Sequence, residues 1–278
     1  MEYTQLTLRN ASYIDASLQS RLRKTRLLLA GCGLGAVVAE VAARTGFERL
    51  RLVDGDRVAP HNLNRQVYLE EDIGLPKAEA LARRLRGIHR EMQVEVHTSW
   101  LSAGNAPALV EGCDLVIDTV DFLDLPAVVA LHDEAARQGK PVISGFACGW
   151  GAVGALFLPG GATLREVFGL PRAGAVGKAS YPELFRRGMR RLAPELPRAF
   201  VAATAGALDG MAEGRPCPAP QLAVGAHCAA ALLVTQVVRW LAGEPLTPAP
   251  ALILVDLASA VSGAGLWAAP VGEFQAAC

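Results

Sequence analysis

The sequence of 278 residues carries no net charge, because its 27 basic residues are balanced by 27 acidic ones. Composition therefore gives no electrostatic reason to bind nucleic acid or an anionic membrane. The first ten residues also lack the apolar core of a signal peptide. From these absences we expect a cytoplasmic protein that binds no DNA and no membrane.

Cysteine pairs of the metal-binding kind are missing as well. The six cysteines are scattered and form no C-x-x-C pair, so zinc is not expected as a cofactor. Without a signal peptide, a disulfide framework is not expected either, and the setting is a reducing cytosol. Cys217 lies in a proline-rich segment, where a nucleophilic role and an inert thiol are both open.

Apolar residues, in contrast, are abundant. They make up 51% of the chain, and the mean hydropathy is +0.27, which favours surface buried in an oligomer such as a homodimer. The longest apolar stretch, residues 222–242, is long enough to cross a membrane. It contains His227, Gln236 and Arg239, which favour a buried amphipathic helix instead.

Short apolar runs alternate with helical segments over the first half of the chain. Strands are expected at residues 26–30, 50–53, 94–97, 115–118, 141–144 and 153–158, and helices at 34–45, 76–88 and 126–138. This alternation predicts an α/β fold with a Rossmann-like, mostly parallel sheet and helices on both faces.

The pattern also suggests how the chain is organised. Residues 1–25 are interpreted as an N-terminal helical lead-in, and residues 26–158 as a nucleotide-binding core. Residues 159–278 would supply a crossover segment, an apolar helix at 221–241 and a C-terminal strand at 251–256 that complete the same domain. Weaker helices are expected at 181–192 and 198–211.

A glycine-rich loop, residues 31–35, links the first expected strand to its helix. Glycines let backbone amides approach phosphates, and a helix N-terminus adds positive potential. A tight strand-to-helix turn without a ligand is the alternative. Asp54 follows the second strand about 20 residues later, where a carboxylate can accept hydrogen bonds from a ribose or cap a turn.

Further polar groups follow at the same edge of the expected sheet. Arg65 offers a planar fork for phosphate oxygens, and Asn62 can donate to a nucleotide or hold its loop. Lys77 stands in the first turn of a helix, against the helix dipole, which a phosphate partner would explain. Asp118 and Asp121 end the fourth strand and could hold Mg²⁺ or cap turns.

In this order and spacing, the motifs resemble those of the ThiF/MoeB/HesA-like adenylyltransferases, relatives of ubiquitin-activating enzymes. That family carries a glycine loop, D-x-D-x-V, N-x-x-R-Q, a lysine that opens a helix, and D-x-x-D. The counterparts here are residues 31–35, 54–58, 62–66, Lys77 and 118–121. The resemblance is strong over residues 18–158 and loose beyond them.

The resemblance implies a role for individual residues. It implies that ATP is bound by Gly31, Gly33, Gly35, Asp54, Asp56, Asn62, Arg65 and Lys77. Arg65, Lys77 and Asp121 would be catalytic, with Asp121 also holding Mg²⁺. The family uses an arginine near the N-terminus that reaches into the partner subunit's site. Arg9 is its counterpart, unless it is a surface arginine.

The resemblance also implies the chemistry. A carboxylate would attack the α-phosphorus of ATP, release pyrophosphate and form an acyl-adenylate. The C-terminal glycine of a ubiquitin-like or sulfur-carrier protein is the favoured carboxylate. A peptide or small carboxylate in natural-product maturation, or a modified tRNA nucleoside, is the alternative. The lack of net positive charge disfavours tRNA, although residues 186–191 are basic.

Some features depart from the family or fit other classes. Cys32 stands where many relatives have glycine, which would narrow the approach of phosphate, and residues 160–220 are unfamiliar. An NAD-dependent oxidoreductase would explain the glycines and Asp54, but not Arg65, Lys77 and Asp121 together. A non-catalytic scaffold that binds nucleotide or nothing and pairs with an active partner is a further alternative; Cys32 favours it, and the retention of Arg65, Lys77 and Asp121 argues against it.

Overall fold

A single mixed sheet runs through the computed structural model, which describes residues 2–121, 124–174, 176, 196–215, 220–262 and 267–269. Its eight strands lie in the order β3-β2-β1-β4-β5-β6-β7-β8. They are β1 (Arg26–Ala30), β2 (Arg49–Val53), β3 (Gln93–His97), β4 (Leu115–Asp118), β5 (Val142–Cys148), β6 (Gly151–Phe157), β7 (Leu252–Asp256) and β8 (Trp267–Ala269). The expected helix at 181–192, the basic run at 186–191 and Cys217 lie outside the described residues.

The first five strands in that order are parallel, and the last three pair antiparallel. The change of direction follows from the connection between β5 and β6. Only Gly149 and Trp150 separate these strands, and so short a link can join antiparallel strands but not parallel ones. Gly149 takes a positive φ of 64° there. The expectation of a mostly parallel α/β sheet is confirmed, with an antiparallel extension.

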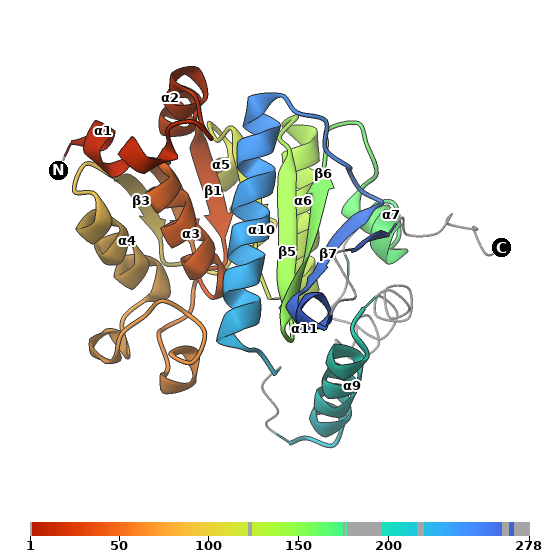
Figure 1. Ribbon diagram of the computed structural model, residues 1–278. Coiled ribbons are helices and arrows are strands. Elements are labelled where there is room, and N and C mark those ends of the chain that lie inside the picture. The colour runs from red at the N-terminus through yellow and green to blue at the C-terminus, as the bar shows by residue number, and fades with distance from the viewer. Residues whose placement is uncertain are drawn as a thin grey trace.

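Two helical layers cover the sheet (Figure 1). One contains α2 (Ala16–Lys24), α3 (Leu34–Thr45), α4 (Lys77–Ile88) and α10 (Ala223–Ala242). The other contains α5 (Ala106–Val110), α6 (Leu125–Arg137) and α7 (Leu164–Phe168). In β1, Leu27 and Leu29 face the first layer while Leu28 and Ala30 face the second, as expected for a strand buried on both faces.

The remaining elements lie at the edges of this arrangement. They are α1 (Tyr3–Leu6), η1 (Leu8–Asn10), η2 (Pro60–Asn62), η3 (Glu70–Asp72), α9 (Arg198–Ala212) and α11 (Leu257–Val261). Phe200 of α9 stacks on Phe146 of β5 with ring centroids 6.0 Å apart. This contact places α9 against the antiparallel half of the sheet.

The apolar helix α10 packs inside the fold. It lies beside α3 and against β5 and β6 (Figure 1), and its buried face includes Ala226, Leu233 and Val237. Gly225 allows close contact, because a Cβ there would lie 2.3 Å from the backbone oxygen of Gly149. Among the described residues α10 alone has the length and composition to cross a membrane, but this packing is that of a core helix.

Candidate functional site

The carboxyl ends of β1, β2 and β4 bring the predicted site residues to one edge of the sheet. The glycine loop follows β1, Asp54 follows β2, and Asp121 lies three residues beyond the end of β4. These strands are parallel neighbours, so their carboxyl ends meet at the same edge. Ligands of open α/β sheets bind at this edge.

The glycine loop is packed tightly against the turn after β4. Gly31 has a φ of 85°, and a Cβ there would lie 2.6 Å from the carbonyl oxygen of Thr119. A Cβ on Gly35 would lie 2.5 Å from Thr119 Oγ1. The Thr119 hydroxyl bonds the carbonyls of Ala30 and Gly31 at 3.0 and 2.8 Å. The loop therefore needs glycine at positions 31 and 35 for packing alone.

Gly33 has a different environment from the other two glycines. A Cβ there would approach only the side chain of Gln66, at 3.3 Å. Gln66 is 8% exposed, and its Oε1 is buried without a hydrogen-bond partner within the described structure. An unpaired polar atom beside a glycine at the start of α3 is suited to a bound polar ligand.

Asp54 ties the glycine loop to the loop after β2. Its carboxylate accepts hydrogen bonds from the backbone N–H of Cys32 at 2.6 Å and of Asp56 at 2.8 Å. A carboxylate has about four acceptor positions, so two remain for a ligand hydroxyl. The residue predicted to hold ribose is therefore held in place by the fold itself.

The Cys32 side chain does not narrow the loop as its sequence position suggested. The residue is fully buried and belongs to the core beneath α3, and burial raises the pKa of its thiol well above the ordinary value. The Tyr68 hydroxyl donates to the carbonyl of Cys32 at 2.7 Å. Only the backbone of Cys32 faces the loop, so the side chain leaves the approach of a phosphate open.

Lys77 and Asp56 form an ion pair at the start of α4. Lys77 Nζ lies 2.5 Å from Asp56 Oδ2, and the backbone N–H of Lys77 donates to the Asp56 carbonyl at 3.0 Å. Burial works to raise the pKa of Asp56, but hydrogen bonds from Lys77 and the Arg57 backbone outweigh it, and the pKa is lowered. Asp56 thus compensates the positive charge that Lys77 brings to the start of α4.

Arg65 is held by hydrogen bonds on two of its three nitrogens. Nε donates to Oε1 of Gln221, and Nη1 donates to the His61 carbonyl and to Asn64 Oδ1, each at 2.9 Å. Burial lowers the pKa of Arg65, while the charge of Asp121 acts in the opposite direction. Arg65 and Asp121 therefore lie close enough to interact electrostatically.

Asn62 holds its own loop. It is 3% exposed, and its Oδ1 accepts from the Ala59 backbone N–H at 2.9 Å, which leaves only the amide nitrogen for a ligand. The structure shows that Asn62 supports its loop, and its contact with a nucleotide stays a prediction.

The two aspartates after β4 have different surroundings. Asp118 is 3% exposed, and its Oδ2 bonds His132 Nε2 at 2.9 Å and the Ser144 hydroxyl at 3.0 Å. Its Oδ1 accepts from the Val120 backbone. Asp121 is exposed at the edge of the sheet. Asp118 is thus committed to holding β4, β5 and α6 together, and Asp121 is the carboxylate that a metal ion could reach.

Arg9 lies far from these residues within one chain. It is exposed in η1. The next residue, Asn10, ends η1, and its side-chain amide donates to the Thr45 carbonyl at the end of α3. That end of α3 is opposite the glycine loop. In one copy of the chain, Arg9 therefore does not contribute to the site.

Four residues that shape the site were not among the candidates from sequence. Thr119 and Tyr68 brace the glycine loop, and Trp100 lies across Gly55, where a Cβ would come within 2.6 Å of the indole. Gln221 contacts Arg65 from 156 residues away. Thr119 could have been suspected from its place inside the D-x-x-D motif, whereas no pattern points to the other three.

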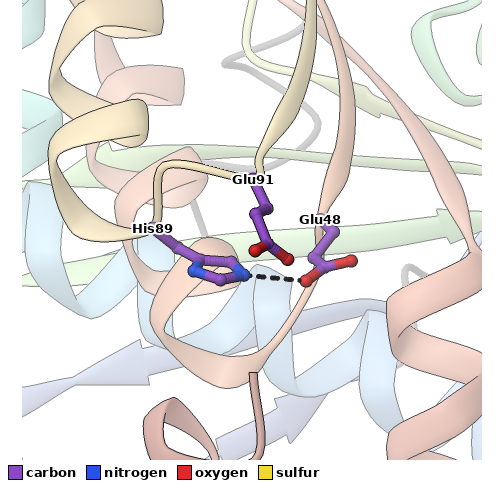
Figure 2. A group of neighbouring side chains, drawn as sticks. All are labelled: Glu48, His89 and Glu91. Atoms are coloured by element: carbon purple, nitrogen blue, oxygen red, sulfur yellow. Dashed lines mark hydrogen bonds and ion pairs between the residues drawn. The ribbon is translucent and has the colours of Figure 1, made fainter. Parts of the chain in front are cut away.

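A histidine–carboxylate cluster occupies the opposite edge of the sheet. Figure 2 shows Glu48, His89 and Glu91 with their side chains turned toward one another, and their ligand atoms lie within 4.8 Å of each other. Glu48 already pairs with Arg23 at 2.7 Å and His89 at 2.9 Å. The cluster joins α2, the start of β2 and the end of α4 through the two ion pairs of Glu48, while Nδ1 of His89 is buried without a hydrogen-bond partner among the described residues.

The arrangement at the carboxyl edge agrees with a comparison with known families. A profile of the ThiF family matches residues 6–262. The chain belongs to the ThiF family. The sequence resemblance to ThiF- and MoeB-like adenylyltransferases is thereby confirmed.

Individual members of the ThiF family are similar over part of their length. The SAMP-activating enzyme E1 of Haloferax volcanii is 32% identical over 152 residues, which cover 54% of this chain and 56% of that protein. The sulfur carrier protein adenylyltransferase of Thermus thermophilus is 35% identical over 129 residues, 46% of this chain and 47% of that protein. The chain thus spans about half the length of these curated relatives.

Solved structures of ThiF-type folds cover almost the whole chain. PaaA is 24% identical with a TM-score of 0.65, over 92% of this chain and 78% of that one. Escherichia coli MccB with MccA-N7isoASN is 20% identical with a TM-score of 0.69, over 99% of this chain and 73% of that one. At this level of identity the likeness concerns the fold.

Proposed function

We propose that the chain is an ATP- and Mg²⁺-dependent adenylyltransferase that activates a carboxylate as its acyl-adenylate. The observation that carries this proposal is the meeting of Asp54, Arg65, Lys77 and Asp121 at one sheet edge in a ThiF-family chain. An oxidoreductase on the same fold would use the glycines and Asp54 to bind NAD, but it would give no role to the two cationic side chains of Arg65 and Lys77 at the same sheet edge.

The residues present fit a nucleotide. The backbone of the glycine loop and the start of α3 provide N–H groups for phosphate, and Asp54 keeps acceptor positions for a ribose. The Gln66 side chain lies beside Gly33 with its Nε2 as the nearest atom, and its buried Oε1, which has no hydrogen-bond partner within the described residues, can accept from a donor on a ligand. Asp121 fits Mg²⁺, which takes one or two protein carboxylates together with phosphate oxygens and waters.

The proposed chemistry is positioning and charge neutralisation. The carboxylate attacks the α-phosphorus, a P–O bond to the leaving pyrophosphate breaks, and the acyl-adenylate forms. When bound, Mg²⁺ would neutralise charge on the phosphates. Arg65 and Lys77 would hold the phosphates and stabilise the charge that builds up as pyrophosphate leaves. To do so, Lys77 would give up part of its ion pair with Asp56 and bind phosphate instead. Because catalysis by positioning and charge stabilisation needs no covalent intermediate, no side-chain nucleophile is required for this step.

The substrate class is proposed from the names of the relatives. Two are called adenylyltransferases of sulfur carrier proteins, from Thermus thermophilus and, for ThiS, from Bacillus subtilis. We infer that the carboxylate is the C-terminal glycine of a ubiquitin-like carrier protein. A peptide carboxylate is the second candidate, and the exchange assay below can distinguish the two.

Two further features belong to the same proposal. A homodimer is supported by exposed apolar residues near the N-terminus, with Leu8 70% and Tyr13 93% exposed. A cytoplasmic setting is supported by Cys32, Cys113, Cys148 and Cys228, which are free thiols as expected in a reducing compartment.

ATP–pyrophosphate exchange tests the proposed function. The chain is supplied with Mg²⁺, ATP, labelled pyrophosphate and either a carrier protein ending in glycine or a peptide. We expect Mg²⁺-dependent exchange that falls at least about a hundredfold in Arg65→Ala and Asp121→Ala, as for loss of one charge-stabilising group.

Arg57→Ala and Asp114→Ala are matched controls. Arg57 lies in the same loop as Arg65 but donates to the Gly74 carbonyl, and Asp114 lies at the opposite edge, where it accepts from the backbone of Arg26. Both should keep their exchange activity. Exchange that survives Arg65→Ala and Asp121→Ala would refute the site, and tight NAD binding without any exchange would favour the oxidoreductase.

A further inference from the structure

Gln221 connects Arg65 to a segment that lies far away in the sequence. It is half-buried two residues before α10 begins. Its side-chain oxygen accepts from Arg65 Nε, and its backbone carbonyl accepts from Asn64 Nδ2 at 3.2 Å. Two neighbouring residues of the loop at 62–66 thus bond Gln221: Arg65 bonds its side chain, and Asn64 bonds its backbone.

The hydrogen bonds of Arg65 divide its guanidinium into an anchored part and an available part. A guanidinium has five N–H donors in a rigid plane. Nε is taken by Gln221, and Nη1 serves the His61 carbonyl and Asn64 Oδ1. Within the described part of the chain, Nη2 donates no hydrogen bond. Its two N–H groups are the ones that remain for an anion.

We propose that Gln221 is a positioning residue that fixes the Arg65 guanidinium with its Nη2 edge available to the phosphates of ATP. This inference rests on the proposed function and extends it to the segment before α10. A long arginine side chain loses much rotamer freedom when it is ordered. Because Nε and Nη1 are already bonded within the chain, the Arg65 side chain has lost this freedom before a phosphate binds. Binding then does not carry the entropy cost of ordering the side chain.

The electrostatic state of Arg65 agrees with this role. Burial lowers the pKa of Arg65, while the charge of Asp121 acts in the opposite direction; the Gln221 amide bonds Nε without adding a negative charge. A glutamate at position 221 would have neutralised the guanidinium. With glutamine, the geometry is fixed while the positive charge remains available for phosphate.

Substitution of Gln221 tests the inference, because only the side-chain contact is removed. Gln221→Met keeps the length of the side chain, and Gln221→Ala shortens it, while the backbone carbonyl that bonds Asn64 remains in both. We expect the Kd for ATP, measured by titration calorimetry, to rise about tenfold in each variant, the effect of losing a hydrogen bond to a charged group. Leu222→Ala is the matched control and should bind ATP as the wild type does.

A double-mutant cycle separates this role from a general effect on folding. In an Arg65→Ala background, Gln221→Met should change the Kd by less than about twofold, because the group that it positions is gone. Equal losses in both backgrounds, an unchanged Kd in Gln221→Met, or tighter ATP binding would each overturn the inference. Absence of ATP binding by the wild type would overturn the proposed function together with it.

Discussion

The polar residues of the site are bonded to one another, and this internal bonding shapes what a ligand has to do. Asp54 accepts from two backbone N–H groups, Lys77 pairs with Asp56, and Arg65 bonds its own loop and Gln221. Groups held in this way are preorganised. A nucleotide would use the acceptor positions and donors that remain, and would replace only the bond between Lys77 and Asp56.

Gly31 offers a residue-scale test of the packing in the loop. Gly31→Ala places a Cβ 2.6 Å from the carbonyl oxygen of Thr119 at a φ of 85°. The atoms that this Cβ would meet belong to the backbone of Thr119 and Val120, which cannot move without straining the turn after β4. We therefore expect the free energy of unfolding to fall by about 2 kcal/mol or more. Urea denaturation followed by circular dichroism measures it.

Gly87→Ala is the control for that experiment. Gly87 lies within α4, and a Cβ there would meet no atom within 4 Å. Alanine at such a site should raise the free energy of unfolding by about 0.5–1 kcal/mol. A Gly31→Ala variant as stable as the wild type would contradict the packing described for the loop.

The Asp56–Lys77 pair predicts a specific dependence of stability on pH. The pKa of Asp56 lies below its ordinary value of 3.8, through hydrogen bonds that outweigh burial. Its contribution to stability is therefore present above pH 3.8 and is lost as the pH falls through the lower pKa of the folded state. The Asp56 side chain is 50% exposed, so this contribution should not exceed about 1 kcal/mol.

Urea denaturation of Asp56→Asn and the wild type between pH 7 and pH 3 checks this prediction. The variant should be less stable by a constant amount near neutral pH, and the two curves should converge at acid pH. Lys77→Met removes the partner and provides the control, since in that background Asp56→Asn should cost little at any pH. Curves that separate further as the pH falls would show the opposite sign and rule out the pairing.

At the scale of elements, hydrophobic periodicity identified the long helices and strands well. Helix α3 begins and ends at the expected residues and closes at Gly46, whose φ is 113°. The expected helix at 221–241 is α10, shifted by two residues at its start and one at its end. Helices α5, α7 and α11 were not predicted, because each has five residues and so short a segment does not show a 3.6-residue period.

The antiparallel extension of the sheet was harder to foresee. Strand β5 was expected to end at residue 144 but continues to Cys148, because it pairs along its full length with β6. Gly145 lies within that strand, and a Cβ there would lie 2.5 Å from the Val153 carbonyl. Glycine in a strand often marks such a close approach, but sequence alone does not show which strand comes close.

Leu233 tests whether α10 stabilises the fold as a core helix. Leu233 is fully buried among α10, α3 and the sheet, so Leu233→Ala should lower the free energy of unfolding by about 2–5 kcal/mol through lost burial and a cavity. Val224→Ala, in the same helix at 43% exposure, should change it by less than about 0.5 kcal/mol. Equal effects in urea denaturation would show that α10 is not packed as described.

For the molecule as a whole, the site is assembled from segments that the fold brings together. The motif spacing placed Asp54, Arg65, Lys77 and Asp121 at one edge, because parallel strands send their carboxyl ends the same way. It did not predict Gln221, since a contact across 156 residues leaves no local pattern. Nor did it show that Asp118 is used by His132 and Ser144, which depends on how α6 and β5 pack.

Arg9 raises the question of whether one copy of the chain contains a complete site. It lies at the edge opposite the glycine loop, in a segment with Leu8 and Tyr13 exposed. The family resemblance implies that this arginine enters the partner subunit's site, which requires a dimer that brings Arg9 of one copy to the carboxyl edge of the other copy's sheet. Arg9→Ala should then abolish pyrophosphate exchange although every other site residue is intact, and sedimentation should show a dimer.

Mixing two inactive variants measures this arrangement directly. When Arg9→Ala and Arg65→Ala subunits exchange freely at equal amounts, half of the dimers are mixed, and each mixed dimer has one site with both arginines. Exchange activity should therefore recover to about a quarter of the wild-type value. A mixture of Arg65→Ala with Asp121→Ala should recover nothing, because both residues belong to the same subunit's site. Full activity of Arg9→Ala alone, or no recovery in the first mixture, would confine the site to a single copy.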